Sequence, residues 1–163
     1  MANGQVNQIF NVLQTIVQDN NVTSEKTWLQ EHLSDARLRP IVARTSVVGL
    51  HILSGLENGQ RKGIDLAEDL NVTRGGIYRA AQSLEQLGLI TSQHAADNKK
   101  NRYYALTDDG QIIARIHDRM HHEMNDQLFA TLEAQFSEAD LATVLRFLQT
   151  VSGFKQDFGQ GED

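Results

Sequence analysis

The stretch DLAEDLNVTRGGIYRAAQSLEQLGLI, residues 65–90, decides the fold. A short helix over 63–70 is expected to break at the segment NVT, and Thr73 can cap a second helix that ends at Gly88. Leu70, Val72 and Ile77 are spaced to form the small apolar core between the two helices. The pattern therefore predicts two short helices joined by a tight turn, which is a helix-turn-helix.

A β-hairpin is expected directly after these helices. LITSQ (89–93) and RYYALT (102–107) are β-prone runs on either side of the polar segment HAADNKKN (94–101). The segment NGQRKG (58–63), before the first helix of the motif, is expected to be a turn. This order of helices, turn and hairpin is that of a winged helix-turn-helix.

The rest of the chain predicts helices, so the expected fold is mainly α with a small β-hairpin wing. We expect N-terminal dimerisation helices over 1–44, the winged helix-turn-helix over 45–110, C-terminal dimerisation helices over 111–156 and a flexible tail over 157–163. Ser137 and Asp140 resemble a capping box for the last helix. The apolar faces of 6–17 and 128–154 exceed what one small winged domain can bury, which favours a homodimer.

Composition excludes several classes of function. The 163 residues include no cysteine, which rules out disulfides, thiolate catalysis and Cys-rich zinc sites. The N-terminus lacks the features of a signal peptide and no apolar run is long enough to span a membrane, so we expect a cytoplasmic protein. The sequence also lacks a nucleophile with a positioned base and a phosphate-binding loop, so we do not expect an enzyme.

The charge distribution points to nucleic acid. The net charge is −6, but between Arg74 and Arg102 five basic residues stand against two acidic ones, a local charge of +3. The residues expected to contact DNA lie on the front of the second helix and at the wing: Thr73, Arg74, Gly75, Tyr78, Arg79, Gln82, Ser83, Lys99, Lys100 and Arg102.

These motifs resemble the MarR-type winged-helix transcriptional regulators, through residues 65–90, the wing ADNKKNRYYALTDDG (96–110) and the flanking helices. RYYALTDDGQ (102–111) is also similar to PadR-type regulators, but those begin almost at the winged helix, whereas here residues 1–44 precede it. The resemblance implies a homodimer that binds a palindromic operator in double-stranded DNA, and we expect a repressor. The wing departs from the family, which commonly has paired arginines where Lys99 and Lys100 stand, so phosphate contact is expected there.

The segment IARIHDRMHHEM (113–124) holds three of the six histidines. His117 and His121 are four residues apart, so on a helix they share one face, either as metal ligands or as a solvated pair. His122 points about 100° away from this pair. His94 belongs to the wing, and neither His122 nor His94 is expected to bind metal.

The resemblance extends to the zinc-responsive MarR-type repressors of streptococci and lactococci. These have a histidine followed by Ile-Leu before the helix-turn-helix and a histidine pair at i and i+4 after the wing. His51 of HIL, His117 and His121 match those positions, which implies that they bind zinc. In these relatives a glutamate near the end of the first helix completes the site.

This chain has extra residues in that region, which leaves Glu31 or His32 as the candidate fourth ligand, with Glu25 and Asp35 behind them. The relatives also have a second metal site, built from one cysteine and two glutamates. Leu50 and Ile116 occupy the two glutamate positions, so the second site is expected to be absent.

An alternative hypothesis has the same dimer gated by a small aromatic or amphipathic effector in a cleft between the dimerisation and winged parts. The histidines would then be structural and metal would have no effect.

Overall fold

The structure is a computed structural model that describes residues 2–18, 22–94 and 102–159, with side chains for 4–13, 24–94 and 102–154. It divides into two compact units, 1–120 and 121–163. The division falls within the long helix α7 (Asp108–Gln135), which is continuous across it.

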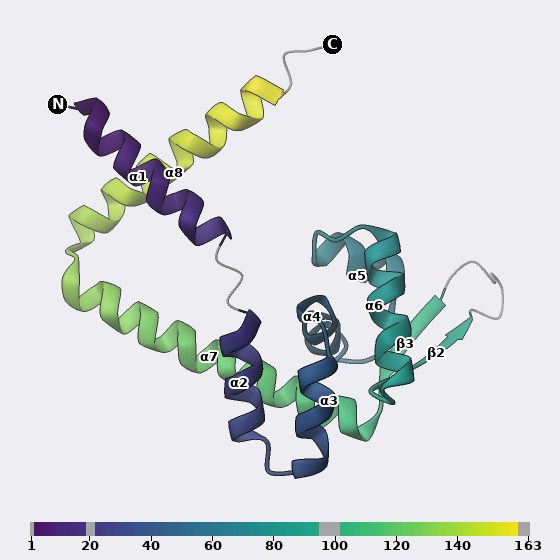
Figure 1. The fold of residues 1–163 in the computed structure, drawn as a ribbon. Helices are drawn as coiled ribbons and strands as arrows, with labels where there is room; N and C mark the ends of the chain where they lie inside the picture. The colour runs from purple at the N-terminus through teal and green to yellow at the C-terminus, as the bar shows by residue number, and fades with distance from the viewer. Residues whose placement is uncertain (1, 19–21, 95–101, 160–163) are drawn as a thin grey trace. The chain divides into compact units, whose positions relative to one another are not determined.

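The first unit opens with helices (Figure 1). These are α1 (Ala2–Gln18), α2 (Val22–His32), the 3₁₀ helix η1 (Ala36–Leu38), α3 (Arg39–Arg44) and α4 (Val47–Gly55). Pro40 stands in the first turn of α3, where its missing N–H costs no hydrogen bond. Ser46 caps α4, because its hydroxyl accepts a hydrogen bond of 3.0 Å from the N–H of Gly49.

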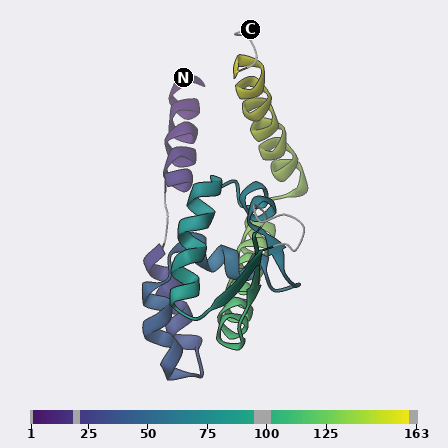
Figure 2. The same cartoon turned by 90° about the vertical axis from the view of Figure 1, so that its right-hand side faces the viewer.

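The winged helix-turn-helix follows, as predicted. It consists of α5 (Gly63–Asp69), α6 (Arg74–Gln86) and the strands β1 (Arg61–Lys62), β2 (Ile90–His94) and β3 (Arg102–Leu106). The sheet is antiparallel in the order β1-β3-β2, and α6 lies beside it (Figure 2). Gly88 follows the end of α6 and has φ +72°, the left-handed conformation that glycine adopts without strain.

The prediction that 58–63 forms only a turn was wrong in its last residues. Arg61 and Lys62 form β1 and pair with Tyr104 and Tyr103 of β3. A two-residue strand shows no alternation of its own, and its pairing depends on a strand some 40 positions further along the chain.

One apolar core holds this unit together. Helix α4, the back of α6, the α6–β2 corner and the first turns of α7 all contribute to it. Its fully buried members include Leu50, Leu53, Leu66, Ile77, Leu84, Leu89 and Ile113. Burial of Ile77 and Leu84 fixes which side of α6 faces the core, and the opposite side is left to solvent.

The second unit contains the rest of α7 and α8 (Glu138–Gly159), which extends three residues beyond the expected end at 156. None of the described side chains from 121 to 154 is buried. Large apolar side chains are exposed along both helices and in the turn between them: Met124, Leu128, Phe129, Phe136, Val144, Leu145, Leu148 and Phe154. Within the described part of the chain, no helix has the length and apolar character needed to cross a membrane.

Candidate DNA-binding face and histidine cluster

The front of α6 is exposed, and the start of the helix is capped. The predicted contact residues on and before this helix are all exposed: Thr73, Arg74, Gly75, Tyr78, Arg79, Gln82 and Ser83. The Thr73 hydroxyl accepts a hydrogen bond of 3.1 Å from the N–H of Gly76, which fixes the first turn. The helix therefore presents one face of long polar side chains while its other face is held in the core.

Of the two adjacent glycines in the first turn of α6, Gly76 is the one at which a side chain would clash. A Cβ at Gly76 would lie 2.7 Å from Cγ1 of Val72, whereas the nearest atom to a Cβ at Gly75 is the flexible end of Arg79 at 3.6 Å. The close neighbour of Gly76 is therefore a side chain of the turn between α5 and α6.

Arg102 lies against α6. Its Cζ is 6.0 Å from the ring centroid of Tyr78, and its Nη2 is 3.9 Å from Oε2 of Glu85. The hydroxyl of Ser92 donates a short hydrogen bond to the same carboxylate. Arg102 Nε is buried with no hydrogen-bond partner. Arg102 thus joins the wing to α6. Lys99 and Lys100, predicted at the wing tip, lie outside the described residues.

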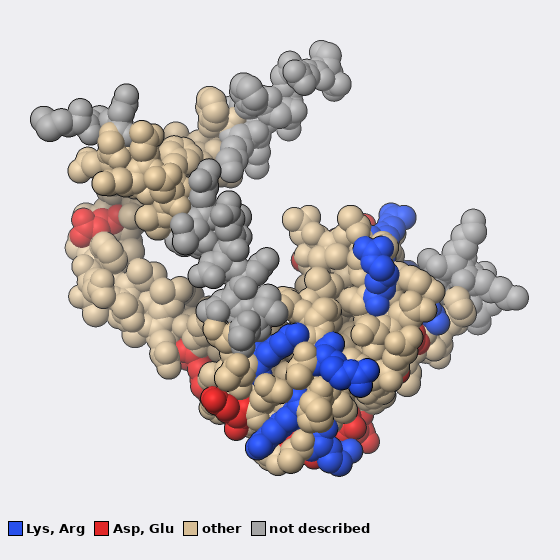
Figure 3. Space-filling view, in the orientation of Figure 1, with Lys and Arg blue, Asp and Glu red and all other residues tan. Residues whose placement is uncertain are grey.

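A depression of about 640 Å³ lies between the start of α5, α6 and the sheet. Its lining is basic and aromatic and includes Lys62, Arg74, Tyr78, His94, Arg102 and Tyr104. Burial raises the pKa of the Tyr104 phenol, which therefore stays neutral at physiological pH. On the face shown in Figure 3, basic side chains gather over the part of the first unit that contains α2, α3 and α6.

Three histidines that are distant in sequence come together. His51 of α4 and His117 and His121 of α7 each offer a nitrogen, and these atoms all lie within 4.8 Å of one another. His117 is only 1 % exposed. The rings of His51 and His117 meet edge to face, with centroids 5.3 Å apart and an interplanar angle of 89°. The predicted set of histidines is therefore assembled by the fold.

This arrangement fits a tetrahedral zinc ion. Zinc binds histidine nitrogen at about 2.0–2.1 Å, so nitrogens in a tetrahedral site lie roughly 3.3 Å apart. The histidine nitrogens already lie within 4.8 Å of one another, so only small side-chain movements would bring them to the separation of a tetrahedral site. Three neutral imidazoles are a common zinc donor set, and a fourth position remains for water or a carboxylate. Beside His117, Asp118 forms a hydrogen bond with Glu57 that raises the pKa of Glu57.

The residues suggested for the fourth position differ in their surroundings. Glu25, Glu31 and His32 all stand outside the group of three histidines, and Glu31 and His32 are exposed. The His32 ring stacks on Trp28 at 3.7 Å, and Asp35 is hydrogen-bonded to Arg37. Glu25 of α2 has one carboxylate oxygen, Oε2, that is buried and has no hydrogen-bond partner.

His122 and His94 are exposed and stand outside the group of three. Leu50 is fully buried among apolar side chains, and Ile116 packs against the same core. Neither position offers a ligand atom for a second metal site.

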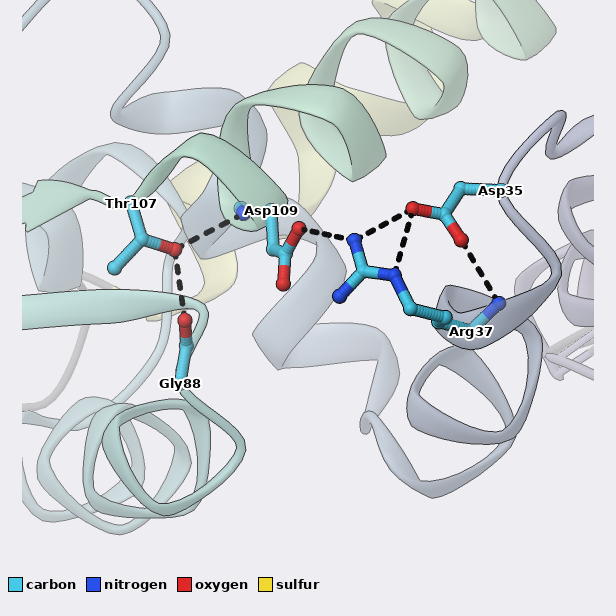
Figure 4. A network of polar contacts seen from close by, with 6 residues as sticks. Asp35, Arg37, Gly88, Thr107 and Asp109 are labelled. Carbon is cyan, nitrogen blue, oxygen red and sulfur yellow. Dashed lines mark hydrogen bonds and ion pairs between the residues drawn. The ribbon is translucent and has the colours of Figure 1, made fainter.

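A joint between α6 and α7 was not evident from the sequence (Figure 4). The Thr107 hydroxyl donates a 2.7 Å hydrogen bond to the carbonyl of Gly88 and accepts one from the N–H of Gly110. The Thr107 N–H donates to the carbonyl of Leu89 at 3.0 Å. The end of α6 is therefore fastened to the start of the helix that carries His117 and His121.

Close to this joint, Arg37 connects η1 to the first turn of α7. Its Nη2 lies 2.6 Å from Asp35 Oδ2 and 3.3 Å from Asp109 Oδ1 (Figure 4). The Arg37 side chain is 69 % exposed, so these ion pairs stabilise the fold only weakly.

Comparison with protein families supports the fold. A model described as the PadR-like family of transcriptional regulators matches residues 50–116. The chain is 32 % identical over 99 residues to YvnA of Bacillus subtilis, an uncharacterised HTH-type transcriptional regulator, covering 60 % of this chain and 62 % of YvnA. It is 24 % identical over 136 residues to the HTH-type regulator PchR of the same organism, covering 81 % and 79 %.

Solved structures of bacterial regulators share the fold. They include the zinc-responsive MarR family member ZitR of Lactococcus lactis (TM-score 0.68, 20 % identity, 94 % and 98 % coverage). They also include FabT of Streptococcus pneumoniae in complex with DNA (0.64, 22 %, 93 % and 98 %) and the repressor AdcR of Streptococcus pyogenes (0.63, 20 %, 91 % and 95 %). At these identities the likeness shows the winged helix-turn-helix fold.

Proposed function

We propose that this chain is a homodimeric, zinc-responsive transcriptional repressor that binds a palindromic operator in double-stranded DNA. The observation that carries the proposal is the cluster of His51, His117 and His121 in a protein with an exposed, basic recognition helix. The comparisons support it with relatives that are HTH-type transcriptional regulators and with a zinc-responsive protein of the same fold.

In the proposed complex α6 enters the major groove. Arg74, Tyr78 and Arg79 extend from its exposed face and can reach base edges and phosphates, with Gln82 and Ser83 further along the helix. Thr73 is placed to bond a phosphate at the helix start, where the positive end of the helix dipole assists. Arg102 supports Tyr78 from the wing, and we propose that Lys99 and Lys100 contact phosphates beyond the recognition helix.

Zinc would couple to DNA through α7. A metal held by His51 of α4 and by His117 and His121 of α7 fixes these two helices against each other. The first turn of α7 is bonded to the α6–β2 corner through Thr107, so fixing α7 restricts the recognition helix that precedes it. Zinc then raises operator affinity to the extent that it binds the DNA-competent arrangement more tightly than other arrangements.

We propose Glu25 as the fourth ligand, ahead of Glu31 and His32. A buried carboxylate oxygen without a hydrogen bond is unfavourable, and a cation supplies the missing partner. In zinc competition with a chromophoric chelator, Glu25→Gln should weaken binding, whereas Glu31→Gln, a change of the same kind at an exposed position of the same helix, should not. Equal affinity for both variants would remove Glu25 from the site.

The central test is operator binding with and without zinc. An operator is selected in vitro from random duplexes with the zinc-loaded protein, and affinity is then measured by fluorescence anisotropy in zinc and in excess chelator. We expect at least several-fold tighter binding with zinc. Equal affinity in both conditions would contradict the zinc mechanism and leave the DNA-binding proposal standing.

Two neighbouring histidines give a matched pair of variants. His121→Ala removes one nitrogen of the cluster, whereas His122→Ala changes an exposed residue that is outside it. We expect His121→Ala to lose the zinc response of operator binding and His122→Ala to keep it. A response that survives in both variants would show that the cluster is not the sensor.

The alternative proposal is that a small aromatic molecule, and not zinc, regulates operator binding. The depression of about 640 Å³ favours it, because cationic and aromatic side chains line it next to α6. It lies within the winged part, whereas we expected such a site in a cleft between the dimerisation and winged parts. Under this alternative, zinc and His121→Ala would leave operator affinity unchanged, and an aromatic carboxylate such as benzoate would lower it.

A further inference from the structure

Ser54 stands beside the histidine cluster and has no role in the function proposed so far. It follows His51 by three residues on α4, so both side chains lie on one side of that helix. Its Oγ is 2.7 Å from Nδ1 of His117, a residue 63 positions away on α7. The hydrogen bond therefore joins the two helices that carry the proposed zinc ligands.

We infer that Ser54 is a positioning residue that holds His117 with its proton on Nδ1 and its Nε2 directed to zinc. The inference rests on the proposed zinc site. A neutral imidazole has one N–H and one lone pair, and a metal takes the lone pair. Since Nδ1 is engaged by Ser54, Nε2 is the nitrogen that we assign to the metal.

The direction of this hydrogen bond follows from the proposed zinc site. A neutral imidazole that gives the lone pair of Nε2 to zinc carries its proton on Nδ1. The Nδ1–H of His117 then donates to Ser54 Oγ, which lies 2.7 Å away. We expect the same tautomer before metal arrives.

Packing alone would not select this ring orientation. The edge-to-face contact with His51 fixes the plane of the His117 ring, but a ring turned over by 180° has almost the same shape. Turning it over would exchange nitrogen and carbon at the position that faces zinc. Because His117 is 1 % exposed, water cannot replace the lost bond to Ser54. The hydroxyl therefore decides which edge of the ring is presented.

A hydroxyl suits a sensor that must release its metal. A carboxylate bonded to Nδ1–H would orient the ring and also make the imidazole a stronger ligand. A neutral hydroxyl orients the ring with a smaller gain in ligand strength. We therefore expect Ser54 to make the apo site ready for zinc without making the metal permanent.

The first experiment observes the apo protein. Long-range ¹H–¹⁵N correlation spectra distinguish the two imidazole tautomers, and His117→Gln identifies the signals. We expect His117 of the wild type to be the Nδ1–H tautomer, Ser54→Ala to lose this preference and Ser54→Thr, which keeps the hydroxyl, to restore it. An Nε2–H tautomer in the wild type, or an unchanged tautomer in Ser54→Ala, would overturn the inference.

The second experiment measures zinc affinity of the full chain by chelator competition. Loss of an outer hydrogen-bond partner typically weakens metal binding by about 10–100-fold, and we expect a loss in this range for Ser54→Ala. Ser54→Thr should recover most of it, and Ser152→Ala, at an exposed serine of α8, should bind as the wild type does. Unchanged affinity in a folded Ser54→Ala would contradict the role proposed for Ser54.

The two proposals fail in different ways. If the wild type does not bind zinc, the proposed function is wrong, and the apo spectra still decide whether Ser54 sets the tautomer of His117. If the wild type binds zinc and Ser54→Ala binds it equally well, the zinc site stands and the positioning role falls.

Discussion

Gly110 is the residue that lets α7 start against the end of the recognition helix. A Cβ at this position would lie 2.0 Å from the carbonyl oxygen of Leu89, a backbone atom that cannot turn away as a side chain can. The same carbonyl accepts the N–H of Thr107, so moving it also disturbs the α6–α7 joint. The absence of a side chain at Gly110 is thus a requirement of the fold.

We predict that Gly110→Ala lowers the free energy of unfolding by about 1–3 kcal/mol, the usual cost of overpacking. Chemical denaturation followed by circular dichroism measures it. Gly75→Ala is the matched control: it is also in the first turns of a helix and its Cβ would meet only the end of Arg79, so its stability should stay equal or rise by up to about 1 kcal/mol. Equal stability of wild type and Gly110→Ala would show that the joint can move.

At the scale of single residues, the sequence predicted which histidines lie together better than it predicted the residues around them. His117 and His121 were recognisable because a spacing of four is local to one helix, and His51 entered through the family resemblance. The bond between Ser54 and His117 spans 63 positions, and the buried oxygen of Glu25 depends on packing around α2. No local pattern marks either of these.

Helix α8 begins with a capping box that the sequence predicted and the structure confirms. The Ser137 N–H donates to Asp140 Oδ2 at 3.0 Å, and the Asp140 N–H donates to Ser137 Oγ at 3.3 Å. Hydrogen bonds from the hydroxyl and the backbone of Ser137 hold the pKa of the Asp140 carboxyl below its usual range. The ionised carboxylate is therefore the form that stabilises the start of α8.

The lowered pKa of Asp140 determines how the stability of the first turn of α8 changes with pH. The stabilisation by Asp140 is present above the carboxyl's unfolded value, near 3.8, and is lost as pH falls through the lower folded value. We predict that amide protection in the first turn of α8, measured by hydrogen exchange, decreases on acidification below about pH 4. Asp140→Asn should remove most of this dependence at that turn, and an identical pH profile in both proteins would contradict the assignment.

At the scale of elements, the sequence predicted the helices and strands that a pattern within one segment marks. It did not predict a strand that depends on pairing with a distant segment. The 3.6-residue period predicted α6, α7 and α8, and the β-prone runs predicted β2 and β3. Strand β1 was missed because two residues carry no period and β3 supplies all of its hydrogen bonds. Helix α3, with Pro40 in its first turn, is six residues long and too short to show a clear period.

At the scale of the whole molecule, the second unit exposes apolar side chains that we expect a partner to cover. None of the described side chains from 121 to 154 is buried, although α7, α8 and Phe136 between them expose eight large apolar side chains there. An amphipathic helix pair without a core is stable only when its apolar stripes are covered. The predicted homodimer supplies that cover with a second copy of the same stripes, and it would also place two recognition helices on one operator.

Two neighbouring residues of α8 test this arrangement. Val144 is 50 % exposed within the apolar stripe, and Thr143 is an exposed polar residue about 100° around the helix from it. We predict that Val144→Glu, which would bury a charge at the interface, shifts the protein toward monomer in sedimentation equilibrium and weakens operator binding by at least 10-fold. Thr143→Glu adds the same charge and should keep both the mass and the operator affinity of the wild type. If Val144→Glu remained dimeric with unchanged operator affinity, the stripe on α8 would not form the dimer interface, and another surface would have to hold the two recognition helices at the spacing of an operator.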